Sequence, residues 1–358
     1  MDKEKSARFM HKVVGDVATA IATGLLLVGD KAGLLRGMAG AGPLHAADLA
    51  ARAGVRQRYT EEWLAAMAGA GYVDYDAATD QFLLPDEHAM FLVDPKAESY
   101  LGGLYGSLPG LLAMAPRLAD AFQSGDGISF ADFGAGMPQM LELMNRPVYE
   151  ARLVSHWLPN LPEVLRRLQS GGRALDIGCG TGVVPITLAK AFPTASISGI
   201  DLDPHSIGIA RSYAQEAGLA DRVQLHAQAI EDLPADARWD LISTFDVVHD
   251  LPDPVAALRR IRAVLSDGGS YLMVEPKVAD DLQSNLANPF ARMLYGISCL
   301  HCVPQSLAQG GSGLGACWGE RRARALAAEA GFAQFERLDI RSAALAFYAL
   351  GDGPVALG

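Results

Sequence analysis

The sequence has few cysteines, no excess of basic residues and no uninterrupted apolar run long enough for a membrane. Its 358 residues include four cysteines and begin with nothing typical of a secretory signal, so we expect reduced thiols and a cytoplasmic protein. The formal net charge of −11 argues against nucleic acid or an anionic membrane surface as a partner. The apolar stretch 13–29 is interrupted by Asp16 and by glycines, which predicts a buried or interface helix rather than a membrane span.

The rest of the composition is that of a folded protein, with 50% hydrophobic and 20% charged residues. Residues 1–95 combine short helix patterns with two strand patterns around a polar turn, which predicts a winged helix. Residues 96–165 predict a helical linker layer that also walls a substrate pocket. From 166 to 358 strands alternate with helices, which predicts a Rossmann-like α/β domain with a parallel sheet. Residues 277–319 interrupt this alternation and predict a lid.

The strands of this sheet are predicted at 173–178, 196–201, 222–226, 240–245 and 269–275. The first ends in Gly178, Gly180 and Gly182, a spacing that differs from the dinucleotide fingerprint and from the P-loop. Asp176 precedes them, and its carboxylate would repel a phosphate but attract an ammonium group. Asp201 ends the second strand, where an acidic side chain accepts hydrogen bonds from ribose hydroxyls. The predicted ligand is a nucleoside with a cationic, phosphate-free tail, a description that S-adenosylmethionine fits.

At these motifs the chain resembles a known family, the class I S-adenosylmethionine-dependent methyltransferases. The stretch LDIGCGTG resembles the first motif of that family, GIDLDP resembles the second, and the likeness runs along the whole chain. The winged-helix front end resembles that of small-molecule O-methyltransferases, and FDVVHDLPDP resembles one bacterial branch whose acceptors are poorly defined. The resemblance implies a small-molecule acceptor and a homodimer formed through the N-terminal domain.

The motifs and the resemblance together predict the cofactor-binding residues Asp176, Gly178, Cys179, Gly180, Gly182, Asp201, Leu202, Ile230, Phe245 and Asp246. One position departs from the family pattern, because Ala229 stands where an acidic residue usually binds the adenine amino group. We expect the adenine to be held instead by the backbone around Ile230, by Gln228, or by Glu231 or Asp232.

His249 follows the fourth strand, at the edge of the sheet where ligands bind. The resemblance implies that it is the general base that removes the proton of a phenol-like hydroxyl before O-methylation, and imidazole titrates near neutral pH. Asp250 is predicted to assist it, and Glu275 is an alternative partner for fixing the tautomer. The other interpretation of His249 is a structural role as a helix cap.

The predicted contacts of the acceptor are Tyr149, Trp157, Met293 and His301. His301 lies between Cys299 and Cys302, but a structural zinc site needs four ligands and only Cys317 is left over, so no metal residue is assigned. An arsenite-type acceptor for these cysteines is disfavoured by the winged-helix front end. A second hypothesis places a metal between His249 and His301, as in the similar C-methyltransferases of 2-oxo acids.

A winged helix also raises the hypothesis of a DNA-binding regulator with a ligand-sensing cofactor domain. From Lys12 to Asp94 there are eleven acidic and six basic residues, a balance of −5, whereas a DNA-reading domain carries a basic face. We therefore expect this domain to dimerise rather than to bind DNA. A cofactor-binding protein without catalytic activity is a further hypothesis, and the presence of His249 argues against it.

Overall fold

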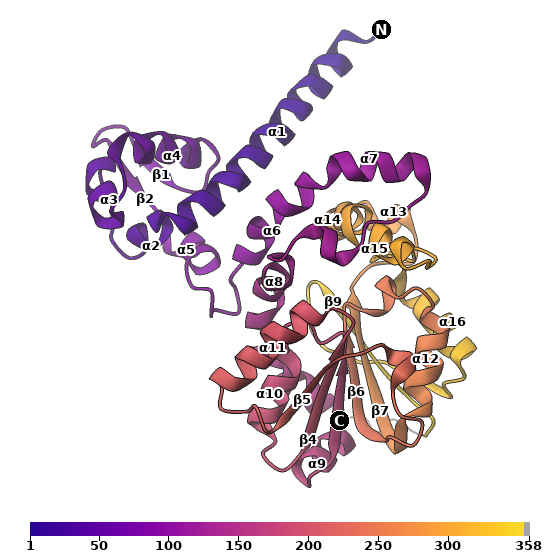
Figure 1. The fold of residues 1–358 in the computed structure, drawn as a ribbon. Coiled ribbons are helices and arrows are strands. Elements are labelled where there is room, and N and C mark those ends of the chain that lie inside the picture. The colour runs from indigo at the N-terminus through magenta and orange to yellow at the C-terminus, as the bar shows by residue number, and fades with distance from the viewer. Residues whose placement is uncertain (354–358) are drawn as a thin grey trace. The chain divides into compact units, whose positions relative to one another are not determined.

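The computed structural model describes residues 1–353, which form two compact units (Figure 1). The first comprises Met1–Pro109 together with Leu143–Pro147. The second comprises Gly110–Glu142 together with the chain from Val148 onward. The helical stretch between the winged helix and the sheet is therefore divided between the two units.

The first unit is a winged helix, as the sequence predicts. Its elements are α1 (Lys3–Lys31), α2 (Leu34–Met38), α3 (Ala46–Ala53), α4 (Gln57–Gly69), β1 (Asp74–Asp76), β2 (Gln81–Leu83), α5 (Asp86–Leu92) and the start of α6 (Gly102–Ala113). The two strands pair antiparallel, and Leu44 adds a single bridge to Phe82. The side chains of Leu35, Leu49 and Leu64 are fully buried among the helices, so this unit has a core of its own.

Helix α1 is packed only along its last third. Its buried residues are Ala22, Leu26 and Gly29, and Gly29 lies so close to Trp63 that an added Cβ would be 2.3 Å from the indole ring. The first 21 residues of the chain are exposed. By length and composition alone α1 is long and apolar enough to cross a membrane, but an interface helix has the same properties.

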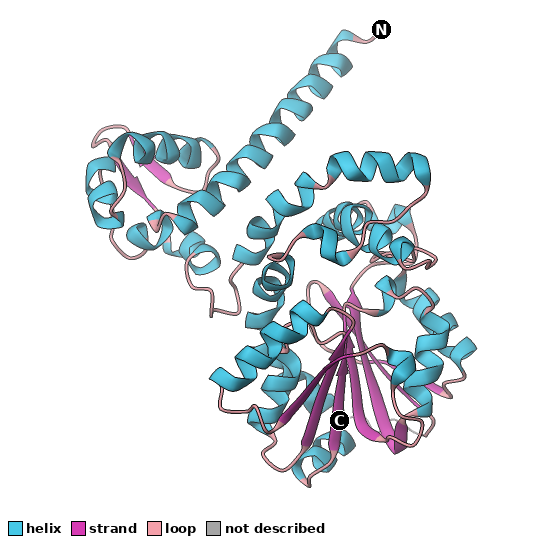
Figure 2. Ribbon diagram, viewed as in Figure 1, coloured by secondary structure: helices cyan, strands magenta, loops and turns pink. Residues whose placement is uncertain are grey.

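The second unit is built on a seven-stranded sheet (Figure 2). Its strands are β3 (Arg173–Ile177), β4 (Ser196–Asp201), β5 (Val223–Ala227), β6 (Trp239–Phe245), β7 (Leu265–Pro276), β8 (Gln334–Arg337) and β9 (Leu345–Gly351). The spatial order is β5-β4-β3-β6-β7-β9-β8, with β3 to β7 parallel and β9 antiparallel to both of its neighbours. Each predicted strand is present, and the Rossmann-like fold is confirmed.

Helices cover both faces of this sheet (Figure 1). On one face lie α9 (Pro162–Gln169), α10 (Val183–Ala191) and α11 (Pro204–Glu216), and on the other lie α12 (Pro254–Ala263) and α16 (Gly319–Ala330). The chain enters at the central strand β3, continues outward to β4 and β5, and then returns to β6 on the opposite side of β3. The loops after β3 and β6 therefore diverge, and ligands of open α/β sheets bind at this crevice.

The insertion after β7 folds as short helices beyond the carboxyl ends of the strands (Figure 1). They are α13 (Leu282–Asn285), α14 (Pro289–Ile297) and α15 (Val303–Ala308), with a π-helical turn η6 (Ser298–Cys302) between the last two. The same unit contains α7 (Ala115–Ser124), the short turn η1 (Phe130–Phe133), most of α8 (Met137–Arg152) and a second π-helical turn, η2 (Leu153–Trp157). π-helical turns occur frequently at functional sites.

Candidate active site

The loop after β3 holds its three glycines in the left-handed backbone region, with φ of 68° at Gly178, 51° at Gly180 and 81° at Gly182. An added Cβ on Gly178 would lie 2.4 Å from Cγ2 of Val247, and one on Gly182 would lie 2.9 Å from Cβ of Ala210. At Gly180 the same position has nothing within 4 Å. The loop is therefore packed against its neighbours at both ends and open in the middle, where a ligand can approach the backbone.

Asp201, the last residue of β4, is held by the backbone at both carboxylate oxygens. Its Oδ2 accepts a hydrogen bond from the Gly180 N–H at 2.8 Å, and its Oδ1 accepts one from the Asp203 N–H at 2.9 Å. Burial raises the pKa of this carboxyl, and the two amide donors act against that shift. Because each carboxylate oxygen has two lone pairs, Asp201 keeps the capacity to accept two further hydrogen bonds from a ligand.

Asp176 is buried within β3. Its carboxylate accepts a hydrogen bond of 2.7 Å from the Ser243 hydroxyl of the neighbouring strand. Burial raises the pKa of Asp176 to about 8, against the effect of the Ser243 hydrogen bond, and the Asp201 carboxylate adds to the rise. A cationic group placed here would favour the ionised form, because it would remove the main cost of burying the charge.

Three aromatic rings pack together below the end of β6. The ring centroid of Tyr149 lies 5.0 Å from that of Phe245 and 5.6 Å from that of Trp157. The Tyr149 hydroxyl donates a hydrogen bond of 3.4 Å to Asp246, whose backbone has a positive φ of 56°. Burial raises the pKa of Asp246 to about 7. Trp157 also contacts Phe347 at 4.9 Å, so it belongs to the hydrophobic core as well as to this cluster.

His249 lies in the short turn η5 (Val248–Asp250) that follows β6, and only 3% of it is exposed. Its Nδ1 lies 2.5 Å from Oε2 of Glu275 at the end of β7. Glu275 is held in turn by the Val248 N–H at 2.9 Å and by the Trp318 indole N–H at 3.2 Å. Burial acts to lower the pKa of His249, but the carboxylates of Asp250 and Glu275 outweigh it and raise that pKa well above its usual value.

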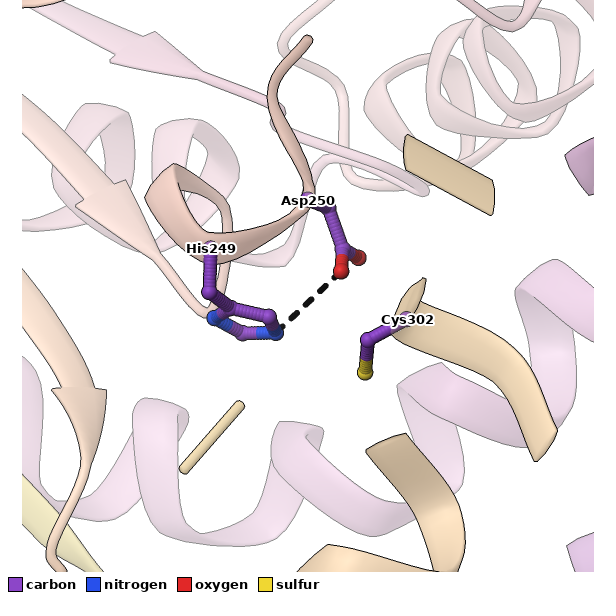
Figure 3. Close-up of side chains that lie close together, drawn as sticks. All are labelled: His249, Asp250 and Cys302. Carbon is purple, nitrogen blue, oxygen red and sulfur yellow. Dashed lines mark ion pairs between the residues drawn. The ribbon is translucent and has the colours of Figure 1, made fainter. Parts of the chain in front are cut away.

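The opposite edge of the imidazole faces two more side chains (Figure 3). His249 Nε2 lies 3.4 Å from Oδ1 of Asp250, and the Cys302 sulfur completes a group whose ligand atoms are all within 4.8 Å of one another. The other oxygen of Asp250 accepts a hydrogen bond of 3.0 Å from the Gln305 amide. Burial raises the pKa of the Cys302 thiol to about 11.

His301 is buried beside this group but is not part of it. Its ring lies edge-on to Phe133 at 4.5 Å and 6.0 Å from Phe130. Burial lowers the pKa of His301 to about 4, and the charge on His249 adds to that effect, so the ring is neutral. Its Nδ1 is buried and makes no hydrogen bond with the described residues 1–353.

A cavity of about 480 Å³ lies between α7 and the helices of the insertion. Its lining is largely apolar and includes Leu118, Phe122, Cys299, Val303 and Leu307. Neither the glycine loop nor His249 lines it. This cavity is therefore separate from the glycine loop and from the His249 group, which lie at the ends of β3, β6 and β7.

Two family models match the chain, and one of them covers the glycine loop and His249. Residues 168–343 match a family described as "Methyltransferase domain", and residues 19–94 match the "Rv2258c-like winged HTH domain". The chain therefore carries a methyltransferase domain, preceded by a winged-helix domain. The glycine loop, Asp201 and His249 all lie within the methyltransferase domain.

Known relatives share parts of the sequence or the whole fold. A ubiquinone biosynthesis O-methyltransferase from Xanthomonas euvesicatoria pv. vesicatoria is 32% identical over 116 residues, which cover 32% of this chain and 47% of that protein. The matched segment thus spans about half the length of that relative. The structure of the mitomycin 7-O-methyltransferase MmcR is similar with a TM-score of 0.69, 21% identity and 98% and 99% of the two chains covered. The structure of human N-acetylserotonin methyltransferase in complex with SAM is similar with a TM-score of 0.63 and 19% identity, and the match covers 99% of each chain.

Most of the predicted site residues lie in two groups, one around the glycine loop and one around His249. Around the glycine loop, the Cys179 N–H donates to the carbonyl of Ile200, Ile230 is buried at the start of the turn Ile230–Asp232, and Leu202 is exposed. Their roles toward the cofactor stay predictions.

The acceptor residues divide differently. Tyr149 and Trp157 lie in the aromatic cluster, His301 lies beside His249, and Met293 on α14 is exposed. The sequence reasoning assigned no role to Cys302, although its place next to His301 in a short Cys- and His-rich stretch was a usable signal.

Proposed function

We propose that this protein transfers the methyl group of S-adenosylmethionine to a hydroxyl group of a small molecule, with His249 as the general base. One observation carries the proposal. The buried carboxylate of Asp176 and the half-buried carboxylate of Asp201 flank the glycine loop, while the His249–Glu275 pair lies at the ends of the neighbouring strands. This places groups suited to a cationic nucleoside beside a group suited to removing a proton. The O-methyltransferase and SAM named for the similar structures support it.

The residues around the glycine loop fit the cofactor. Asp201 has two oriented oxygens with spare lone pairs for ribose hydroxyls, and Gly180 leaves its backbone accessible. Asp176 is a buried carboxyl whose raised pKa reflects an anion without sufficient compensation, so an ammonium group suits it. A pyrophosphate would meet repulsion from the same carboxylates. When bound, the cofactor supplies a methyl group on a sulfonium, which is a good leaving group.

His249 is suited to receive the proton of the acceptor hydroxyl. With Nδ1 held at 2.5 Å by Glu275, that nitrogen carries the ring proton and Nε2 is left to accept one. Asp250, 3.4 Å from Nε2, stabilises the imidazolium that forms. A raised pKa makes the ring a stronger proton acceptor once it is neutral, and the burial of the site excludes competing water.

The test is the transfer of a labelled methyl group from S-adenosylmethionine to a panel of phenols, catechols and hydroxyquinones. We expect a methyl ether product with the unaltered chain, and cofactor binding without transfer for His249→Ala. The proposal fails if the chain binds no S-adenosylmethionine, or if methyl transfer is unchanged in the His249 variant.

The comparisons favour neither alternative function. C-methylation of 2-oxo acids was inferred from a metal held by His249 and His301, and the group of ligand atoms around His249 contains Asp250 and Cys302 instead of His301. Regulation by DNA binding was inferred from the winged helix alone, whose charge balance is acidic.

The finer proposal for assembly is a homodimer formed through α1. Exposed apolar side chains recur along this helix at Phe9, Met10, Val13, Val14, Val17 and Ile21. Most of them repeat every three or four residues and so form one stripe, which suits a helix of a second copy. Light scattering of the unaltered chain and of Val14→Asp should give a dimer and a monomer respectively. A monomer in both cases would contradict the proposal.

The finer proposal for location is the cytoplasm. All four cysteines are free, and the Cys179 and Cys302 thiols are buried. Free thiols suit a reducing compartment. Cell fractionation of a tagged chain tests this proposal, and recovery with the membranes would contradict it.

A further inference from the structure

The group formed by His249, Asp250 and Cys302 has the composition of a transition-metal site. It offers an imidazole nitrogen, a carboxylate oxygen and a sulfur, all within 4.8 Å of one another (Figure 3). Cysteine and histidine ligands favour zinc and similar ions over magnesium and calcium, which prefer oxygen ligands. Three protein ligands with one open position is the arrangement of zinc sites that also bind a substrate or water.

One distance already fits such a site. Zinc ligands lie about 2.0–2.1 Å from the ion for nitrogen and oxygen, so two of them at a tetrahedral angle are about 3.3–3.4 Å apart. His249 Nε2 and Asp250 Oδ1 are 3.4 Å apart. The Cys302 sulfur lies within the same 4.8 Å limit, and a rotation about its Cα–Cβ bond changes its distance to both atoms.

The three ligand atoms interact with one another, since the Cys302 side chain bonds to both His249 and Asp250, while the surrounding residues engage other atoms of these side chains. Glu275 holds His249 at Nδ1, which is the other nitrogen of the ring, and Gln305 holds Asp250 at Oδ2. Asp250 Oδ1 is buried and accepts no hydrogen bond from the described residues outside this group. Metal-binding histidines characteristically donate their second nitrogen to a carboxylate, so this is the outer shell that a metal site needs.

The chain brings Cys302 to this point by an irregularity in its backbone. The π-helical turn η6 ends at Cys302 and buries two consecutive residues, His301 and Cys302, while Cys299 in the same turn is exposed. A regular helix turns successive residues about 100° apart, so it rarely buries two neighbours on one small site. The turn thus presents one thiol to His249 and leaves the other outside.

We propose that His249 Nε2, Asp250 Oδ1 and Cys302 Sγ bind a zinc-class divalent cation, with a fourth position open to water. The charges balance, because one carboxylate and one thiolate neutralise a divalent cation in a buried site. Binding releases the Cys302 proton. The cation and the acceptor proton compete for the same lone pair of His249, so His249 can act as the general base only when the cation is absent, and a loaded site is inactive in the proposed methyl transfer.

The test uses Co²⁺ as the probe for the full-length chain after treatment with a chelator. We expect one Co²⁺ per chain, with a near-ultraviolet thiolate-to-metal absorption band and the visible bands of a tetrahedral ion, both lost when Zn²⁺ is added. Cys302→Ser should abolish the thiolate band. Cys299→Ser is the matched control, since it removes an exposed thiol of the same turn and should leave the band intact.

A second variant keeps the test decisive if Cys302→Ser does not fold. Gln305→Ala removes only the hydrogen bond that orients Asp250, and it should weaken Co²⁺ binding about 10–100-fold, the usual effect of losing an outer-shell partner. The proposal is overturned if the unaltered chain shows no thiolate band, or if the band disappears in Cys299→Ser but not in Cys302→Ser. The readout needs neither cofactor nor acceptor, so its failure would leave the proposed methyl transfer untouched.

Discussion

The two halves of the active site are built in different ways. At the ends of β3 and β4 the site is mostly backbone, with a glycine loop held by Asp201 through a hydrogen bond to the Gly180 N–H. At the ends of β6 and β7 it is mostly side chains, with His249 positioned by Glu275 and faced by Cys302 from the insertion. A site built from the backbone suits a cofactor that is always the same. A site built from side chains can change by substitution without disturbing the sheet.

The same contrast explains the electrostatics. On the cofactor side Asp176 is buried and Asp201 is half-buried, and the raised pKa values of both carboxyls mark a place that a cation would stabilise. On the acceptor side the carboxylates of Glu275 and Asp250 surround an imidazole, and the pKa of His249 is raised instead. A cation would therefore stabilise the cofactor side, whereas on the acceptor side the two carboxylates would stabilise the imidazolium that forms when His249 accepts a proton.

The largest expected effect is a loss of methyl transfer without a loss of cofactor binding, which would separate the acceptor side from the cofactor side. His249→Ala should lower kcat by about 10²–10⁴-fold, because this is the usual contribution of a general base, while the Kd for S-adenosylmethionine stays within about twofold. The measurements are a methyl transfer assay and a calorimetric titration with the cofactor. Asp201→Ala should instead abolish binding of S-adenosylmethionine, so that methyl transfer is lost because no cofactor is bound. Loss of cofactor binding in the His249 variant would show that the two sides are not independent.

The next prediction compares two glycines of one loop. Gly178→Ala places a Cβ 2.4 Å from Val247 at a φ of 68°, so it should lower the free energy of unfolding by about 2–3 kcal/mol. Gly180→Ala meets open space and should cost only the backbone strain, about 1 kcal/mol, yet its methyl group stands where the ligand approaches. Thermal unfolding should therefore rank Gly178→Ala as the less stable variant, and cofactor titration should show severe weakening for Gly180→Ala.

A third prediction uses the titration of Asp176. Its pKa of about 8 means that the carboxyl is largely protonated at pH 6.5, and only the anion attracts the cationic tail. Cofactor affinity should therefore fall by up to about tenfold for each pH unit below 8 and reach its full value above 8. The cofactor's own amine titrates too, so the quantity to measure is the ratio of Kd between Asp176→Asn and the unaltered chain at each pH. A ratio that does not vary with pH would contradict the assignment.

The sequence predicted the cofactor side better than the acceptor side, and the reason is distance along the chain. The glycine loop is a local signal, since the positive φ values and the close approach of Val247 and Ala210 demand glycine whatever else the chain does. The strands follow from apolar runs, so the sheet was predicted with nearly correct bounds. Glu275 lies 26 residues from His249, and it was only one of two candidates for its partner.

The position of Cys302 beside His249 was not predicted, because it depends on two structural features that no local sequence pattern encodes. Its turn is π-helical rather than α-helical, and the insertion folds back so that a residue 53 positions after His249 faces the imidazole. The alternative metal hypothesis paired His249 with His301, one residue away from the side chain that completes the group of ligand atoms around His249. Met293 is exposed on α14, and its predicted contact with the acceptor stays a prediction.

The smallest expected effect tests whether the pKa of Asp176 depends on its one side-chain donor. Ser243→Ala removes the 2.7 Å hydrogen bond, which is worth about 1 kcal/mol, so cofactor binding near pH 7 should weaken about fivefold and the pH at which affinity is half-maximal should rise. Thr244→Val is the matched control, because the neighbouring hydroxyl bonds to Tyr271 at 2.7 Å on the opposite face of β6. Thr244→Val should lower the free energy of unfolding about as much as Ser243→Ala does, without shifting the pH dependence of cofactor affinity. Equal shifts in both variants would mean that the strand, and not the hydrogen bond, sets the charge of Asp176.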